Sequence, residues 1–165
     1  MFFSKYLFYA DDLKVFKKIR NANDCQELQS DLNRFVDYCA KTKLIINVDK
    51  CFAITFTRNH NKVVFDYSLG ANILRREQKA RDLGVLFDEK MIFDLHIETV
   101  VNNAFRMLGF INRQSKQLQN NNSLITLYYA YVFSRLNFAS SVWNPMYNKV
   151  YIQRLERVQN KFLKT

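Results

Sequence analysis

The hydrophobic pattern of this chain changes near residues 88–92, from a mixture of strand-like and helical spacing to helical spacing alone. Before that point, apolar residues alternate with polar ones or run in short blocks, as in residues 5–9 and 52–56, which is typical of strands. After it, apolar residues follow a helical spacing, beginning with Ile97, Val101, Ala104, Leu108 and Ile111. This change predicts an α+β fold in which a mixed part, residues 1–90, precedes an all-helical part, residues 91–165.

Within the mixed part, two short apolar runs at residues 5–9 and 13–19 predict a β-hairpin. A helix should follow, with Asp24 as its N-cap, Glu27 completing a capping box and lysines near residues 41–43 at its end. Further antiparallel strands are expected after this helix. Residues 43–57 should form a short strand, a turn at Asn47 to Lys50 and a second strand, and two more strands are expected at residues 63–69 and 81–88.

Three helices are expected in the second part, starting near residues 93 and 124 and including residues 151–162. Trp143 and Pro145 lie between the last two, where we expect a packing corner rather than a stacking platform. The longest strictly apolar stretch, residues 127–133, is too short to cross a bilayer, which needs about 20 residues. We therefore expect no membrane partner.

Charge and composition narrow the classes of function. Lys and Arg outnumber Asp and Glu by 25 to 15, which gives a net charge of +10 and favours a polyanionic partner such as nucleic acid, although a basic soluble protein is the alternative. Three glycines and one proline are too few for a phosphate-binding loop, so P-loop and dinucleotide-binding folds are excluded. Cys25, Cys39 and Cys51 have no paired spacing, which predicts reduced thiols, no disulfide partner and an intracellular protein.

Two adjacent carboxylates, Asp11 and Asp12, occupy the tip of the predicted hairpin. Like charges about 4 Å apart repel by roughly 1 kcal/mol even in water, and by more near a protein surface. An acidic solvent-exposed turn is the ordinary alternative, because Asp is a favoured turn residue. Here apolar residues flank the pair on both sides, so a divalent cation that neutralises both carboxylates is the second interpretation.

Several stretches then match one family in order and spacing over nearly the whole chain. FYADDLKVF resembles the Y-x-D-D motif of reverse transcriptases, specifically those of non-LTR (LINE-type) retrotransposons of the jockey group. The matching segments that follow are KLIINVDKC, RDLGVLFDEKMIFDLHI, RMLGFINRQSK, LYYAYVFSRLNFASSVWNP and RLERVQNKFLK.

The resemblance implies that residues 1–90 are the C-terminal part of a polymerase palm. Asp11 and Asp12 would hold catalytic Mg²⁺, two ions in the intact enzyme, while Tyr9 and Ala10 would shape the wall beside the nucleotide and primer end. Lys50 matches a lysine that assists the pyrophosphate leaving group, against the alternative of a solvated turn lysine. The primer-grip strand would contain Leu83, Gly84 and Val85, and a glycine there is also consistent with a buried strand that carries a bulge.

Residues 91–165 would correspond to the helical thumb and the connection segment after it, which grip an RNA–DNA duplex formed by template and primer. Such a surface binds through phosphate contacts and is sensitive to salt. A solvated helix face is the alternative for any one cation. The residues expected at the nucleic-acid backbone are Arg106, Arg113, Lys116, Arg135, Arg154 and Arg157.

The family also needs a third palm aspartate and fingers that close over the dNTP, both located before Y-x-D-D, whereas only eight residues precede Tyr9 here. We therefore expect a fragment of a reverse transcriptase that does not polymerise alone, in the nucleus or cytoplasm. The competing hypotheses are a non-catalytic, basic nucleic-acid-binding remnant of a decayed mobile element, and a pseudogene product with an unstable half-palm.

Overall fold

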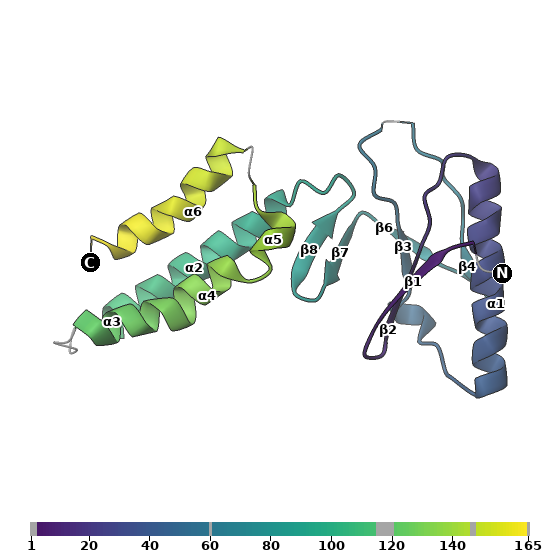
Figure 1. The fold of residues 1–165 in the computed structure, drawn as a ribbon, viewed down its shortest axis with the longest axis horizontal. Helices are drawn as coiled ribbons and strands as arrows, with labels where there is room; N and C mark the ends of the chain where they lie inside the picture. The colour runs from purple at the N-terminus through teal and green to yellow at the C-terminus, as the bar shows by residue number, and fades with distance from the viewer. Residues whose placement is uncertain (1–2, 60, 115–120, 146–147, 165) are drawn as a thin grey trace. The chain divides into compact units, whose positions relative to one another are not determined.

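A computed structural model describes residues 3–59, 61–114, 121–145 and 148–164 (Figure 1). The chain forms two compact units, Met1–Gln78 and Lys79–Thr165. This division falls earlier than the expected boundary at residue 90, because strand β8 (Val85–Asp88) contributes Val85 to the same core as the helices that follow. In the described residues after residue 90 the secondary structure is helical, as predicted. The assignment of the two parts to palm and thumb stays a prediction.

The first unit begins with the predicted hairpin. Strands β1 (Lys5–Tyr9) and β2 (Asp12–Phe16) pair antiparallel, with Tyr9 opposite Asp12 at the tip and Lys5 opposite Phe16 at the other end. Strand β2 ends at Phe16, whereas we had expected it to continue to residue 19. Only Ala10 and Asp11 lie between the strands, so the connection is as short as hairpin turns allow.

Helix α1 (Ala22–Thr42) follows, and its cap differs from the prediction. Asn21 is the N-cap: its side chain accepts a hydrogen bond from the Asp24 amide at 3.0 Å, and Asp24 accepts one from the Asn21 amide at 3.3 Å. The prediction that Asp24 is the cap and Glu27 its partner was wrong, because Asp24 is the third residue of the helix and is itself the partner of the Asn21 cap. Glu27 instead forms an ion pair with Lys17. The helix ends at the predicted place, with Lys43 in a left-handed conformation.

The rest of the first unit consists of short strands around a small core. Strands β4 (Ser68–Leu69) and β5 (Asn72–Ile73) form a hairpin, whereas β3 (Phe52–Ile54) and β6 (Arg75–Glu77) pair parallel. The expectation of antiparallel strands was therefore wrong for β3 and β6. The chain between them, which includes the β4–β5 hairpin, is long enough to form the crossover that a parallel pair requires. The buried residues of this core are Cys25, Leu32, Tyr67 and Leu69.

The second unit opens with the hairpin of β7 (Lys79–Asp82) and β8. Leu83 and Gly84 form its turn with φ values of +44° and +86°, and two positive values in succession are the requirement of a type I′ turn. The sequence had placed Gly84 inside a strand, which was wrong. The neighbour that a glycine accommodates here is a side chain, since a Cβ on Gly84 would lie 3.1 Å from the Phe138 ring.

Helices make up the remainder of the second unit (Figure 1). Helix α2 (Asp94–Gln114) buries the predicted stripe that ends in Leu108 and Ile111. The helical elements that follow it are α3 (Asn121–Tyr128), a π-helical turn η3 (Tyr129–Phe133), α4 (Ser134–Asn137), α5 (Ser140–Trp143) and α6 (Lys149–Phe162).

The predicted packing corner at Trp143 is confirmed. Trp143 is buried, and its indole N–H donates a hydrogen bond to the Phe138 carbonyl at 2.8 Å. Between these two residues, Ala139 has a φ of +50° and separates α4 from α5. Among the described residues, no helix combines the length and apolar character needed to span a membrane.

Candidate functional site

The tip of the β1–β2 hairpin presents the acidic pair on a rigid turn. Ala10 has a φ of +51°, a left-handed conformation that costs an L-residue with a Cβ about 1 kcal/mol. Asp11 and Asp12 are exposed, and Tyr9 is 61 % exposed beside them. Strain at such a position is common where a turn must hold side chains for binding. The predicted metal ligands and the predicted nucleotide-wall residues are therefore together at one end of the hairpin.

Neither carboxylate of the pair is used by the fold. Within the part of the chain that the structure describes, neither Asp11 nor Asp12 forms an ion pair or accepts a side-chain hydrogen bond. Carboxylate oxygens are the donors that Mg²⁺ prefers, and the ion commonly takes one or two of them together with water and substrate phosphates. The pair therefore fits a partial ligand set for Mg²⁺.

A complete ligand set is not assembled. Across the described ranges, there is no group of three or more His, Cys, Asp or Glu side chains that could hold a metal ion. Two carboxylates at one hairpin tip cannot supply the protein ligands of two ions that clamp a phosphoryl transfer.

The hairpin is anchored by a residue that the sequence analysis did not single out. Asp31 of α1 is fully buried, and its Oδ2 accepts hydrogen bonds at 2.7 Å from the backbone amides of Phe3 and Ser4, just before β1. Its other oxygen lies 3.5 Å from the Arg34 guanidinium, while the Phe3 ring lies under the cations of Lys17 and Arg34. The available signal was a charged residue directly before Leu32, an apolar residue of the same predicted helix.

Lys50, the expected proton donor, lies in a short 3₁₀ turn, η1 (Val48–Lys50), and is exposed. Its ammonium forms no ion pair with Asp11 or Asp12 among the described side chains. Cys51 follows it, and its thiol donates a weak hydrogen bond to the Asn47 carbonyl. Burial raises the pKa of the Cys51 thiol, so Cys51 remains a protonated structural residue.

The expected primer-grip residues divide between surface and core. Leu83 is 52 % exposed at the tip of the β7–β8 hairpin, next to exposed Gly84. Val85, in contrast, is 3 % exposed and packs in the core of the second unit. Only the first two can offer side-chain or backbone surface to a partner.

A buried histidine supports this hairpin from α2. His96 Nδ1 accepts a hydrogen bond from the Leu86 amide at 3.2 Å, and its ring packs edge-on against Trp143. Burial, with a smaller contribution from Arg81, lowers the pKa of His96, so the ring is neutral and carries its proton on Nε2. The start of α2 is fixed nearby, because the Asp88 carboxylate accepts hydrogen bonds from the amides of Lys90, Ile92 and Phe93.

Five of the six expected backbone-binding cations are described and exposed, while Lys116 lies outside the described residues. In the described part of the chain none of the five forms an ion pair with a carboxylate, so their charges are not neutralised within the fold. These residues are Arg106, Arg113, Arg135, Arg154 and Arg157.

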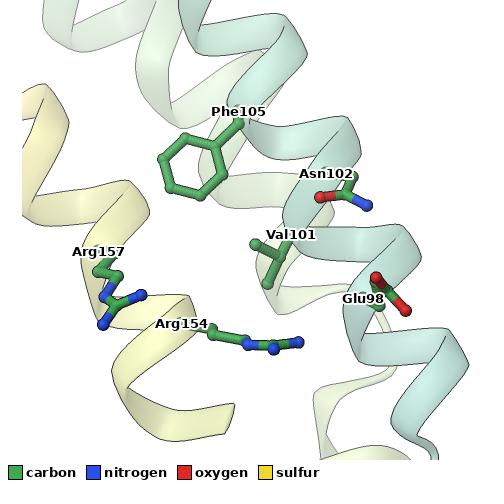
Figure 2. A pocket seen from close by; sticks show the side chains of 6 residues that line it. All are labelled: Glu98, Val101, Asn102, Phe105, Arg154 and Arg157. Carbon is green, nitrogen blue, oxygen red and sulfur yellow. The ribbon is translucent and has the colours of Figure 1, made fainter. Parts of the chain in front are cut away.

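Two of these arginines line a hollow of about 300 Å³ between α2 and α6 (Figure 2). Arg154 and Arg157 form the α6 wall. The sequence analysis did not predict the α2 wall as a site, although its residues lie three, four and seven positions after Glu98 and so share one helix face. That wall contains Glu98, Val101, Asn102 and Phe105.

Comparison with known proteins supports the family resemblance. The chain is 32 % identical over 99 residues to the RNA-directed DNA polymerase from mobile element jockey of Drosophila melanogaster. It is 33 % identical over 101 residues to the protein of the same name from Drosophila funebris. Each match covers 59 % of this chain and 11 % of the relative, so the chain corresponds to a small part of the length of these proteins.

No family model matches the chain, and no solved structure matches it. The two curated matches confirm the predicted resemblance to non-LTR, jockey-like reverse transcriptases.

Proposed function

We propose that this chain is a part of an RNA-directed DNA polymerase in which the β1–β2 hairpin offers Asp11 and Asp12 to Mg²⁺ and the helical unit binds an RNA–DNA duplex. The observation that carries the proposal is the strained, exposed hairpin tip. Within the described ranges neither of its two carboxylates forms an ion pair or accepts a side-chain hydrogen bond, and the chain is similar to jockey polymerases. The intact enzyme would use an RNA template, a DNA primer and dNTPs.

In this proposal, Mg²⁺ supplies charge neutralisation at the transferred phosphate when it is bound. The chain's own residues bind the ion and orient the reacting groups. Asp11 and Asp12 contribute oxygen ligands from a rigid turn, and Tyr9 and Ala10 form the adjacent wall. Lys50 donates a proton to the leaving group, while Leu83 and Gly84 contact the primer.

We further propose that the chain does not polymerise by itself, because its hairpin supplies two carboxylates where a two-ion site needs more. A primer-extension assay with Mg²⁺, dNTPs and a primed RNA template tests this. We expect no template-dependent product. Robust synthesis that disappears in Asp11→Ala would overturn this part of the proposal.

A second candidate function, a non-catalytic nucleic-acid-binding protein, is favoured by the net charge of +10 and by the five exposed arginines that lack ion-pair partners in the described ranges. Both functions predict binding of an RNA–DNA duplex whose affinity falls as salt is added, so that log Kd rises linearly with the logarithm of the salt concentration. The Mg²⁺ dependence separates them. In the polymerase-derived protein, Mg²⁺ strengthens duplex binding and Asp11→Asn/Asp12→Asn removes that effect, whereas a purely basic surface is indifferent to both carboxylates.

A cooperative melt followed by circular dichroism must accompany these assays. The absence of a cooperative transition would favour the pseudogene hypothesis, in which the first unit has no stable fold.

A further inference from the structure

The hollow between α2 and α6 is lined by apolar and uncharged or acidic side chains as well as by arginines, whereas binding to duplex phosphates needs only the arginines. Its volume of about 300 Å³ lies at the lower end of the range for small-ligand sites, which run from about 300 to about 1,000 Å³. Its floor is apolar, since Val101 is buried and the half-buried Phe105 side chain points into the space between the two helices (Figure 2). A phosphate group alone would contact neither of these residues productively.

The polar side chains of the hollow differ between its two walls: those on α6 are cationic, whereas those on α2 are a carboxylate and an amide. Arg154 and Arg157 lie one helical turn apart on α6. Each guanidinium group can bind a phosphate through bidentate hydrogen bonds. Glu98 and Asn102, one turn apart on α2, bring a hydrogen-bond acceptor and an amide that both donates and accepts. This is the combination that recognises a nucleobase edge next to its phosphodiester.

Cation–aromatic contacts orient one arginine and the aromatic ring of the hollow. The Arg154 guanidinium lies 5.6 Å from the centre of the Tyr151 ring, and the Lys161 ammonium lies 5.7 Å from the centre of the Phe105 ring. Hydrogen bonding to the Asp94 carboxylate is the main cause of the raised pKa of Tyr151, so Tyr151 stays neutral beneath Arg154. Side chains that are already oriented lose less entropy when they bind.

We propose that this hollow binds one unpaired nucleotide of a single-stranded nucleic acid, with the phosphodiester between Arg154 and Arg157 and the base against Phe105. The proposal rests on the proposed function and specifies its strand preference. Bases in a duplex are paired and stacked, so a duplex can offer only its sugar–phosphate surface to α6, whereas an unpaired nucleotide can place its base between the two helices.

The experiment compares the affinity of the full chain for a 12-nucleotide single strand and for an RNA–DNA duplex of the same length, at one fixed salt concentration. Arg154→Gln/Arg157→Gln should lower single-strand affinity by about tenfold more than duplex affinity, because only the single strand places a phosphodiester between these two guanidinium groups inside the hollow. Phe105→Leu keeps an apolar side chain but removes the ring. It should lower single-strand affinity by about fivefold or more and leave duplex affinity unchanged, in line with measured base-stacking contributions.

Arg106→Gln/Arg113→Gln is the matched control, because it removes two exposed charges from α2 without altering the lining of the hollow. It should lower both affinities by the same factor. The proposal is overturned if the two pocket variants change the ratio of single-strand to duplex affinity no more than this control does. Failure of the wild-type chain to bind the duplex at all would count instead against the proposed function.

Discussion

The carboxylate of Asp31 accepts a hydrogen bond from the backbone amide of Phe3 at 2.7 Å, and thereby joins the middle of helix α1 to the residues that lead into the β1–β2 hairpin. A second hydrogen bond of the same length comes from the Ser4 amide. A two-stranded hairpin is marginally stable in isolation, so this attachment matters for the position of the acidic tip.

Replacing Asp31 should therefore loosen the hairpin. Asp31→Ala leaves two amides without their charged acceptor, and we expect a loss of about 3 kcal/mol in the free energy of unfolding of the first unit. Amide hydrogen exchange should quicken throughout Lys5–Tyr9 and remain unchanged in α2. Asp37→Ala, which removes an exposed carboxylate from the same helix, is the control and should have little effect. Equal effects of the two variants would contradict the anchoring role.

The second unit should lose stability in mild acid because of His96. Its folded pKa lies below the ordinary value, so the unfolded chain takes up a proton at a higher pH than the folded chain does. The stability contributed by neutral His96 is complete above about pH 6.5 and is lost progressively as the pH falls below that value.

Urea unfolding at pH 8 and pH 5.5 checks this prediction, with fluorescence of the single tryptophan, Trp143, as the probe beside His96. The wild-type midpoint should fall at the lower pH. His96→Asn retains an acceptor for the Leu86 amide but does not titrate, so it should show a smaller fall. A pH dependence of the same size in both proteins would show that another group is responsible.

The tip of the β7–β8 hairpin combines strain with exposure, since Leu83 has a φ of +44° and is 52 % exposed. Asparagine tolerates this conformation and Asn-Gly is the preferred pair for a type I′ turn, so Leu83→Asn should stabilise the unit by about 1 kcal/mol. If Leu83 contacts the primer, the same variant should bind an RNA–DNA duplex more weakly. Leu163→Asn removes a leucine side chain that is even more exposed, at 72 %, at the end of α6 and should change neither quantity. Increased stability with unchanged duplex affinity would refute the primer contact.

The parts of the fold that could be predicted from the sequence are those that depend on residues close together in the chain. The hairpin around Asp11 and Asp12 and the buried stripe of α2 follow from short-range alternation and helical spacing, and both were confirmed. The cap of α1 was misplaced by one turn, because Asn21 and Asp24 both have cap chemistry and the sequence does not show which one begins the helix.

The remaining features depend on relationships that local patterns do not contain. Strands β3 and β6 are not adjacent in the sequence, and they pair parallel because the chain between them crosses over. A local sequence pattern does not show which distant strand will be the partner. A left-handed leucine at residue 83 opposes the usual preference of that residue type, so Gly84 was placed in a strand rather than in a turn. The buried carboxylate of Asp31 and the hollow between α2 and α6 arise only when distant segments pack together.

Binding of a divalent ion at the hairpin tip tests the central claim most directly. Mn²⁺ can replace Mg²⁺ as a paramagnetic probe, and the amide NMR signals of Tyr9–Leu13 can be followed in the full chain. We predict broadening of these signals that saturates with Mn²⁺ and is reversed by excess Mg²⁺. It should disappear in Asp11→Asn/Asp12→Asn and persist in the charge-matched control Asp37→Asn/Asp49→Asn. No broadening at the tip, or broadening that survives loss of both tip carboxylates, would contradict the proposed metal-binding role of this hairpin.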